Sequence, residues 1–129
     1  MRRLLVTLAL GAALAVGCGD DDGEAGRTAT VANGGAVRVV ADEYAFDPET
    51  VVYDTGGAKA TIEISLDNEG TLAHNLKVFD GERELGGTTT FPPGRTETGV
   101  VELGPGEYRM VCTVANHAEL GMAGTLKVR

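Results

Sequence analysis

Short runs of alternating apolar and polar residues, separated by turn residues, constrain the fold of this chain most strongly. The alternation is cleanest over residues 60–67, where Ile62, Ile64 and Leu66 would face a core and the residues between them would face solvent. No segment has a sustained helical period. We expect strands over Val37–Ala41, Thr50–Tyr53, Ala60–Asp67, Thr71–Phe79, Thr96–Leu103, Glu107–Val114 and Thr125–Val128, with a loop or short turn over Glu82–Thr90.

Turn sequences such as Asn68-Glu69-Gly70 and Pro105-Gly106 divide these runs. Seven to eight short strands in one modest domain predict an all-β fold, a Greek-key β-sandwich over residues 36–129. We expect the hydroxyl of Tyr108 to brace a strand crossing.

Sulfur and imidazole side chains form the second informative pattern. Cys112, His117 and Met122 lie within eleven residues, and the only other histidine, His74, lies 38 residues before Cys112. The alternation around His74 places it on one face with Leu72, Leu76 and Val78. Two imidazoles, one thiolate and one weak thioether form a blue-copper ligand set. A site built from separate strands exists only after the sheets have packed, so metal binding and folding should be coupled.

Each of these residues alone has an ordinary structural interpretation. A single buried histidine is usually a core residue, a single cysteine is usually a small buried hydrophobic residue, and a methionine fills gaps. The joint pattern favours a metal site, because the chain places both of its histidines in it. Met110, two residues before Cys112 on the same run, is expected in the core and not at the metal.

The segment from Leu103 to Val128 resembles the cupredoxin family of plastocyanin, azurin and pseudoazurin. The similarity rests on Leu103-Gly104-Pro105-Gly106-Glu107-Tyr108, on Cys112, His117 and Met122, on Gly124-Thr125-Leu126-Lys127-Val128, and on the upstream pair His74-Asn75. It extends over about Val37 to Arg129, and the ligand loop is its specific part. Four residues between Cys112 and His117 resemble azurin, and four between His117 and Met122 resemble plastocyanin, so the loop is a hybrid.

The resemblance implies one type 1 copper ion, with His74, Cys112 and His117 as equatorial ligands and Met122 as the long axial ligand. It also implies that Asn75 forms a hydrogen bond to the backbone near Cys112 and holds the ligand loop rigid. The ring edge of His117 would reach the surface within an apolar rim. Residues available for that rim are Val114, Ala115, Ala118 and Leu120, which could equally just close the end of the sandwich.

Four protein ligands leave no open position for a substrate, so the pattern favours one-electron transfer between redox protein partners over catalysis. Copper oxidases and nitrite reductases need further histidines, and this chain has none, so we do not expect an enzyme. The alternative is a copper carrier or buffering protein at the cell surface. A metal-free adhesive sandwich and zinc at the same ligands are further alternatives.

The first 17 residues have the composition of a signal peptide. Arg2 and Arg3 precede an apolar segment, Leu4–Val16, that is short for a membrane span. Gly17-Cys18 resembles a bacterial lipoprotein signal in which Cys18 is lipidated, which predicts a membrane-anchored protein of the bacterial cell envelope. An ordinary signal peptide with an unrelated cysteine is the alternative. A Cys18–Cys112 disulfide is disfavoured because it would consume the metal thiolate.

Residues 18–35 are expected to be a flexible linker, because they lack apolar periodicity. The run Asp20-Asp21-Asp22 fits a solvated acidic linker better than a cation site. Removing Arg2 and Arg3 from the 11 basic residues leaves 9 against 19 acidic residues, a formal net charge of −10. This charge disfavours nucleic acid and favours positively charged redox partners. We expect a monomer.

Overall fold

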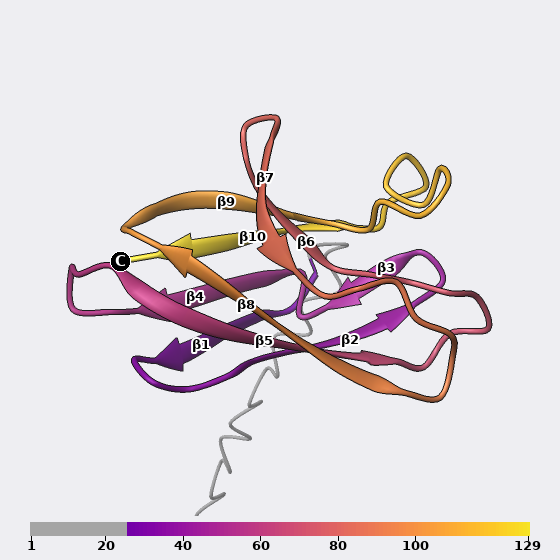
Figure 1. Cartoon of the computed structure of the whole chain (residues 1–129), viewed down its shortest axis with the longest axis horizontal. Helices are drawn as coiled ribbons and strands as arrows, with labels where there is room; N and C mark the ends of the chain where they lie inside the picture. The colour runs from indigo at the N-terminus through magenta and orange to yellow at the C-terminus, as the bar shows by residue number, and fades with distance from the viewer. Residues whose placement is uncertain (1–25) are drawn as a thin grey trace, which may run out of the picture.

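The computed structural model describes residues 26–129, which form ten β-strands (Figure 1). The strands are β1 (Thr28–Ala32), β2 (Val37–Asp42), β3 (Ala45–Asp47), β4 (Thr50–Asp54), β5 (Ala60–Asn68), β6 (Lys77–Asp80), β7 (Arg83–Gly87), β8 (Thr96–Leu103), β9 (Gly106–Val111) and β10 (Ala123–Val128). The described residues contain no helix of any kind, and hence none that could cross a bilayer. The predicted all-β sandwich is confirmed, with ten strands in place of seven to eight.

The strands hydrogen-bond in the order β1-β4-β10-β9-β6-β7-β8-β5-β2-β3, so the sheet curls on itself. This order divides at its shortest pairing, between β7 and β8, into one layer of β1, β4, β10, β9, β6 and β7 and another of β8, β5, β2 and β3. The layers meet where β7 pairs with β8 at the single position Gly87–Val100. A side chain at Gly99 would collide with the backbone of Gly87 and Thr88, so the absence of a Cβ at Gly99 permits this junction.

Apolar side chains from both layers fill the space between them. Ile62, Ile64 and Leu66 of β5 are fully buried, as the alternation predicted. Met110 is also fully buried and belongs to the same core cluster. The hydroxyl of Tyr108 donates a hydrogen bond of 2.8 Å to the carbonyl of Gly104, which confirms its predicted bracing role next to the β8–β9 turn.

The sequence did not predict three of the strands, β1, β3 and β7, and there is a physical reason why each was missed. β1 pairs in parallel with β4 at the edge of the sheet, so the predicted linker over residues 18–35 is wrong for its last part. Alternate side chains of β1 are only partly buried, so its sequence shows only a weak alternation of apolar and polar residues. β3 is three residues long. β7 lies inside the predicted loop over Glu82–Thr90, where two glycines at its end argued against a strand.

The predicted strand over Thr71–Phe79 is also wrong in its first half. Only the part from Lys77 onward is a strand, and residues 69–73 form a loop. The buried side chain of Asn68 shapes this loop, because its amide donates to the carbonyl oxygen of Leu72 and its carbonyl accepts from Gly70. Leu72 is therefore 42% exposed and does not share the buried face of His74.

Candidate metal centre

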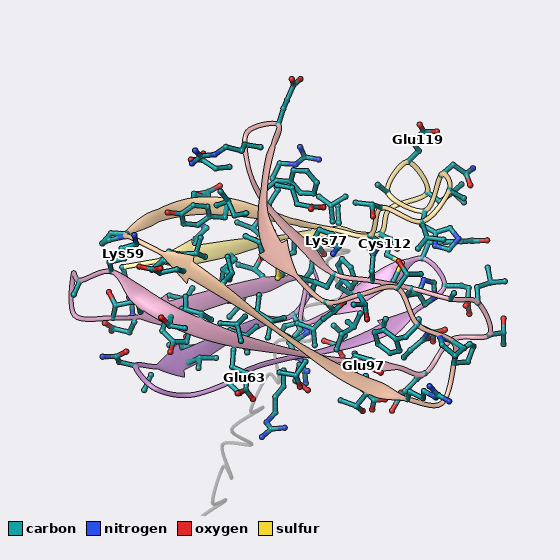
Figure 2. All side chains as sticks on the ribbon, in the orientation of Figure 1. Lys59, Glu63, Lys77, Glu97, Cys112 and Glu119 are labelled. Atoms are coloured by element: carbon teal, nitrogen blue, oxygen red, sulfur yellow. The ribbon has the colours of Figure 1, made fainter. Side chains whose placement is uncertain are left out.

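The predicted ligands gather at one end of the sandwich. Figure 2 shows Cys112 beneath the loop that carries Glu119, with Lys59 at the opposite end of the molecule. Three segments converge here: the turn between β2 and β3, the segment between β5 and β6, and the loop between β9 and β10.

Cys112 follows directly after β9, and the ligand loop leaves and returns beside it. The loop is a series of tight turns, in which the His117 backbone N–H donates to Val114 and the Gly121 N–H donates to Ala118. Gly121 has a φ of 114°, a conformation that a residue with a Cβ rarely adopts. These turns hold His117 over Cys112 at little entropic cost.

His74 comes from the other side of the site. Its backbone forms an isolated two-way bridge with Phe91, with N–O distances of 3.2 and 3.1 Å. Its side chain is fully buried. The bridge fixes the point at which His74 enters the core, so the position of its ring depends on the 88–91 segment as well as on the segment that precedes β6.

His74, Cys112 and His117 form one compact donor cluster, in which one ligand atom of each lies within 4.8 Å of the others. The sulfur of Cys112 is 3.6 Å from Nδ1 of His117 and 4.0 Å from Nδ1 of His74. A metal centred in a planar set, with bonds of about 2.3 Å to sulfur and about 2.0–2.1 Å to nitrogen, would separate sulfur and nitrogen by about 3.8 Å. The donor spacing therefore fits a single ion.

Met122 is the last residue of the loop before β10, and it is fully buried. Its carbonyl accepts a hydrogen bond of 3.1 Å from the Cys112 N–H, and its own N–H donates to the carbonyl of His117 at 3.0 Å. Met122 is thus joined through its backbone to two of the three clustered residues.

Asn75 connects the His74 segment to the ligand loop. Its side-chain oxygen accepts a hydrogen bond of 2.8 Å from the backbone N–H of Thr113, the residue after Cys112. Its amide nitrogen donates to the hydroxyls of Thr113 at 2.8 Å and Thr90 at 2.9 Å. Three segments are therefore tied together directly beneath the cluster.

Glu43 is a site residue that sequence reasoning missed. It lies in the turn between β2 and β3, and its Oε1 is 3.1 Å from Nε2 of His74. The pKa of Glu43 is lowered to about 2, chiefly by the hydrogen bond from the Leu72 N–H, against partial desolvation, and further by Thr71 and His74. An ionised carboxylate accepts hydrogen bonds only, so this contact is a hydrogen bond when Nε2 of His74 carries the ring proton.

His117 is the less enclosed of the two histidines, because the residue is 5% exposed and His74 is not exposed at all. It packs edge-to-face against His74, with ring centroids 5.1 Å apart, and against Tyr44, at 5.0 Å. Tyr44 is partly buried. The two aromatic contacts limit rotation of the His117 ring.

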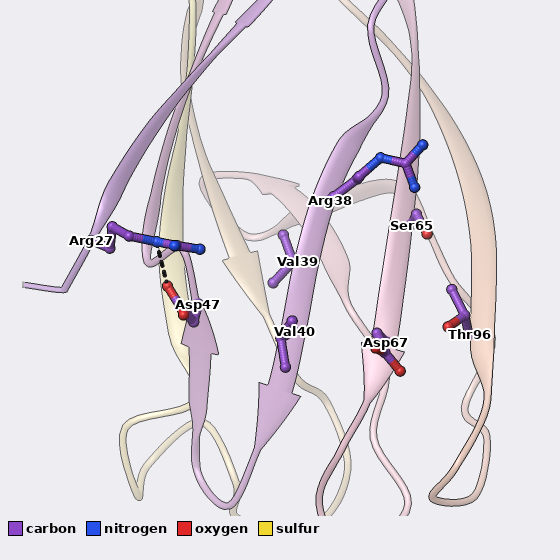
Figure 3. Close-up of a pocket in the computed structure, with 8 residues that line it drawn as sticks. All are labelled: Arg27, Arg38, Val39, Val40, Asp47, Ser65, Asp67 and Thr96. Carbon is purple, nitrogen blue, oxygen red and sulfur yellow. Dashed lines mark ion pairs between the residues drawn. The ribbon is translucent and has the colours of Figure 1, made fainter.

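A surface pocket of about 300 Å³ shares no residue with the cluster. Figure 3 shows it on β2 and β5, with Arg38, Ser65 and Asp67 among its lining residues and an ion pair between Arg27 and Asp47 at one side.

Cys18, the predicted lipidation site, lies outside the described residues. Within residues 26–129, Cys112 forms no disulfide.

No protein-family model and no curated protein matches the chain. Solved structures do match. The reduced auracyanin of the photosynthetic bacterium Roseiflexus castenholzii is 21% identical, with 81% of this chain and 98% of that chain covered at a TM-score of 0.61. Auracyanin B is 20% identical, with 78% and 88% covered at a TM-score of 0.64. An azurin from Methylomonas sp. strain J is 15% identical, with 74% and 98% covered at a TM-score of 0.61.

These neighbours are cupredoxins, and the likeness covers 74–81% of this chain. The chain has the cupredoxin fold, and within it His74, Cys112 and His117 form one cluster, with Met122 bonded through its backbone to Cys112 and His117.

Proposed function

We propose that this protein is a one-electron carrier that holds one type 1 copper ion. His74, Cys112 and His117 would bind the ion through two ring nitrogens and one sulfur, and Met122 would be the weak axial ligand. The observation that carries this proposal is the convergence of one ring nitrogen of each histidine and Sγ of Cys112 within 4.8 Å in a buried site. Bound copper supplies a couple between Cu(II) and Cu(I).

The residues around the cluster suit a carrier because they resist rearrangement. Asn75 ties the ligand loop to the His74 segment, and the turns over 114–121 hold His117 in place. A site that changes shape little between two oxidation states lets an electron enter and leave with a small reorganisation cost. Both histidines of the chain are used as ligands, so none is left for the second copper centre of a copper enzyme. We therefore propose no catalytic activity.

The surface around His117 supports a role in partner contact. Leu120, which is 51% exposed, and Ala115, which is also exposed, lie on the same loop as His117. Apolar side chains next to the least enclosed ligand allow a redox protein to approach the ring closely. The acidic charge of the chain favours a positively charged partner and a rate of association that falls with salt.

We also propose that the protein is exported and anchored to a membrane of the bacterial cell envelope through lipidated Cys18. This proposal rests on the sequence of residues 1–18 alone. Mass spectrometry of the mature protein from its native host tests it: a first residue Cys18 carrying acyl groups is expected, and an unmodified N-terminus would remove the anchor.

Spectroscopy and electrochemistry of the purified full chain with Cu(II) test the carrier function. We expect one copper per chain, an intense visible absorption from charge transfer between thiolate and copper, and reversible one-electron voltammetry. Cys112→Ser should lose the visible band. Met110→Leu, a control change at a buried core methionine that is not a proposed ligand, should keep the band. Tight copper binding without a reversible couple would instead indicate a copper carrier or buffering protein.

A further inference from the structure

Glu43 makes more contacts with the site than its place in a turn would suggest. A single oxygen, Oε1, accepts hydrogen bonds from the backbone N–H groups of Thr71 at 2.7 Å and Leu72 at 2.9 Å and from Nε2 of His74 at 3.1 Å. The carboxylate thus joins the β2–β3 turn to the loop that leads into His74.

The two backbone hydrogen bonds hold Oε1 in place independently of the imidazole. Space around this oxygen is restricted as well: a Cβ at Gly70 would collide with the Glu43 carboxylate and would lie 2.9 Å from Nε2 of His74. The His74 side chain is fully buried, whereas the Glu43 side chain is 23% exposed. The carboxylate is therefore a fixed acceptor at the far side of a buried ring.

A fixed anionic acceptor at Nε2 has two consequences for Nδ1. When the proton of the neutral ring is held on Nε2, Nδ1 is left with its lone pair free to bind an ion, and this atom lies 4.0 Å from Sγ of Cys112. The negative charge also increases the electron density of the ring and so makes Nδ1 a stronger donor. A stronger donor and a nearby negative charge both favour the higher positive charge of an ion bound at Nδ1.

We propose that Glu43 is the positioning residue of this centre: it selects the Nε2–H tautomer of His74 and lowers the reduction potential of copper held there. Glu43 itself does not bind the ion, since its carboxylate faces the ring nitrogen that points away from Cys112. The part of the proposal that concerns the potential rests on the proposed function, and the part that concerns the tautomer does not.

The test compares Glu43→Gln and Glu43→Ala with the unchanged full chain. Glu43→Gln keeps the size and one acceptor oxygen but removes the charge, and Glu43→Ala removes both. Glu119→Gln is the matched control, because it removes the same charge from an exposed position on the ligand loop, where solvent screens it. Circular dichroism of each variant verifies that it folds.

The first measurement is the 15N NMR spectrum of the His74 ring in the metal-free protein, at a pH where the ring is neutral. We expect the Nε2–H tautomer in the unchanged protein and in Glu119→Gln, and a mixture of both tautomers in Glu43→Ala. One tautomer at full population in Glu43→Ala would overturn the positioning role, whether or not the protein binds copper.

The second measurement is voltammetry and Cu(II) affinity of the same proteins. We expect a higher reduction potential in both Glu43 variants, an affinity about 10–100-fold lower in Glu43→Ala, and a smaller loss in Glu43→Gln. Equal potentials in Glu43→Gln and Glu119→Gln would overturn the electrostatic role. Failure of the unchanged protein to bind copper would contradict the proposed function and leave the tautomer result to decide the positioning role.

Discussion

Replacement of Asn75 by alanine should loosen the joint between the His74 segment and the ligand loop. The side chain forms three hydrogen bonds, to the N–H and hydroxyl of Thr113 and to the hydroxyl of Thr90, and it is only 3% exposed. A net contribution of about 1 kcal/mol for each bond gives an upper figure of about 3 kcal/mol. Thr113 and Thr90 are exposed and regain hydrogen bonds to water, so we expect a loss of about 2 kcal/mol.

Urea unfolding of the metal-free full chain, followed by circular dichroism, measures this loss. With a slope of about 1–3 kcal/mol per molar urea, the midpoint should fall by roughly 1 M. Thr113→Ala removes one of the three bonds and keeps the backbone N–H, so it should lose about 1 kcal/mol. A loss below about 0.5 kcal/mol in Asn75→Ala, or equal losses in the two variants, would refute the reasoning that Asn75 joins these segments.

Three further predictions concern other residues of the fold and site. Tyr108→Phe removes the hydrogen bond to Gly104 and should lower the free energy of unfolding by about 1 kcal/mol in the same urea assay. Met122→Leu should keep a coloured copper site with an altered potential in voltammetry; an unchanged potential and spectrum would contradict the axial role. The lowered pKa of Glu43 stabilises the metal-free fold above pH about 4.5, and this stability should be lost as the pH falls toward about 2. Between pH about 4.5 and about 2, the free energy of unfolding should therefore fall less in Glu43→Gln than in the unchanged chain. Identical profiles of stability against pH in the two proteins would contradict this role of Glu43.

The sequence predicts the site well where chemistry and local spacing carry the information. Cys112, His117 and Met122 lie on one short loop, so their proximity follows from chain length, and residue types alone suggest copper. The core face of β5 follows from simple alternation, because it is buried on one side and solvated on the other. These features depend on residues close together in the chain.

Features that depend on distant contacts were missed. Glu43 has no periodic signal, and its importance arises from a contact with His74, 31 residues later. β1 pairs with β4 in parallel, and no turn sequence next to β1 indicates this pairing. Leu72 leaves the buried face because Asn68 bends the preceding loop through hydrogen bonds that alternation does not encode. Contacts between distant residues decided the first two cases, and local hydrogen bonds between a side chain and the backbone decided the third.

X-ray absorption at the copper edge of the Cu(II)-loaded full chain tests the central claim most directly, because it identifies the atoms bound to the metal. The account predicts one short copper–sulfur distance and two copper–nitrogen distances of about 2.0 Å, with the sulfur contribution lost in Cys112→Ser. Copper surrounded only by nitrogen and oxygen, with the same spectrum in Cys112→Ser, would contradict it.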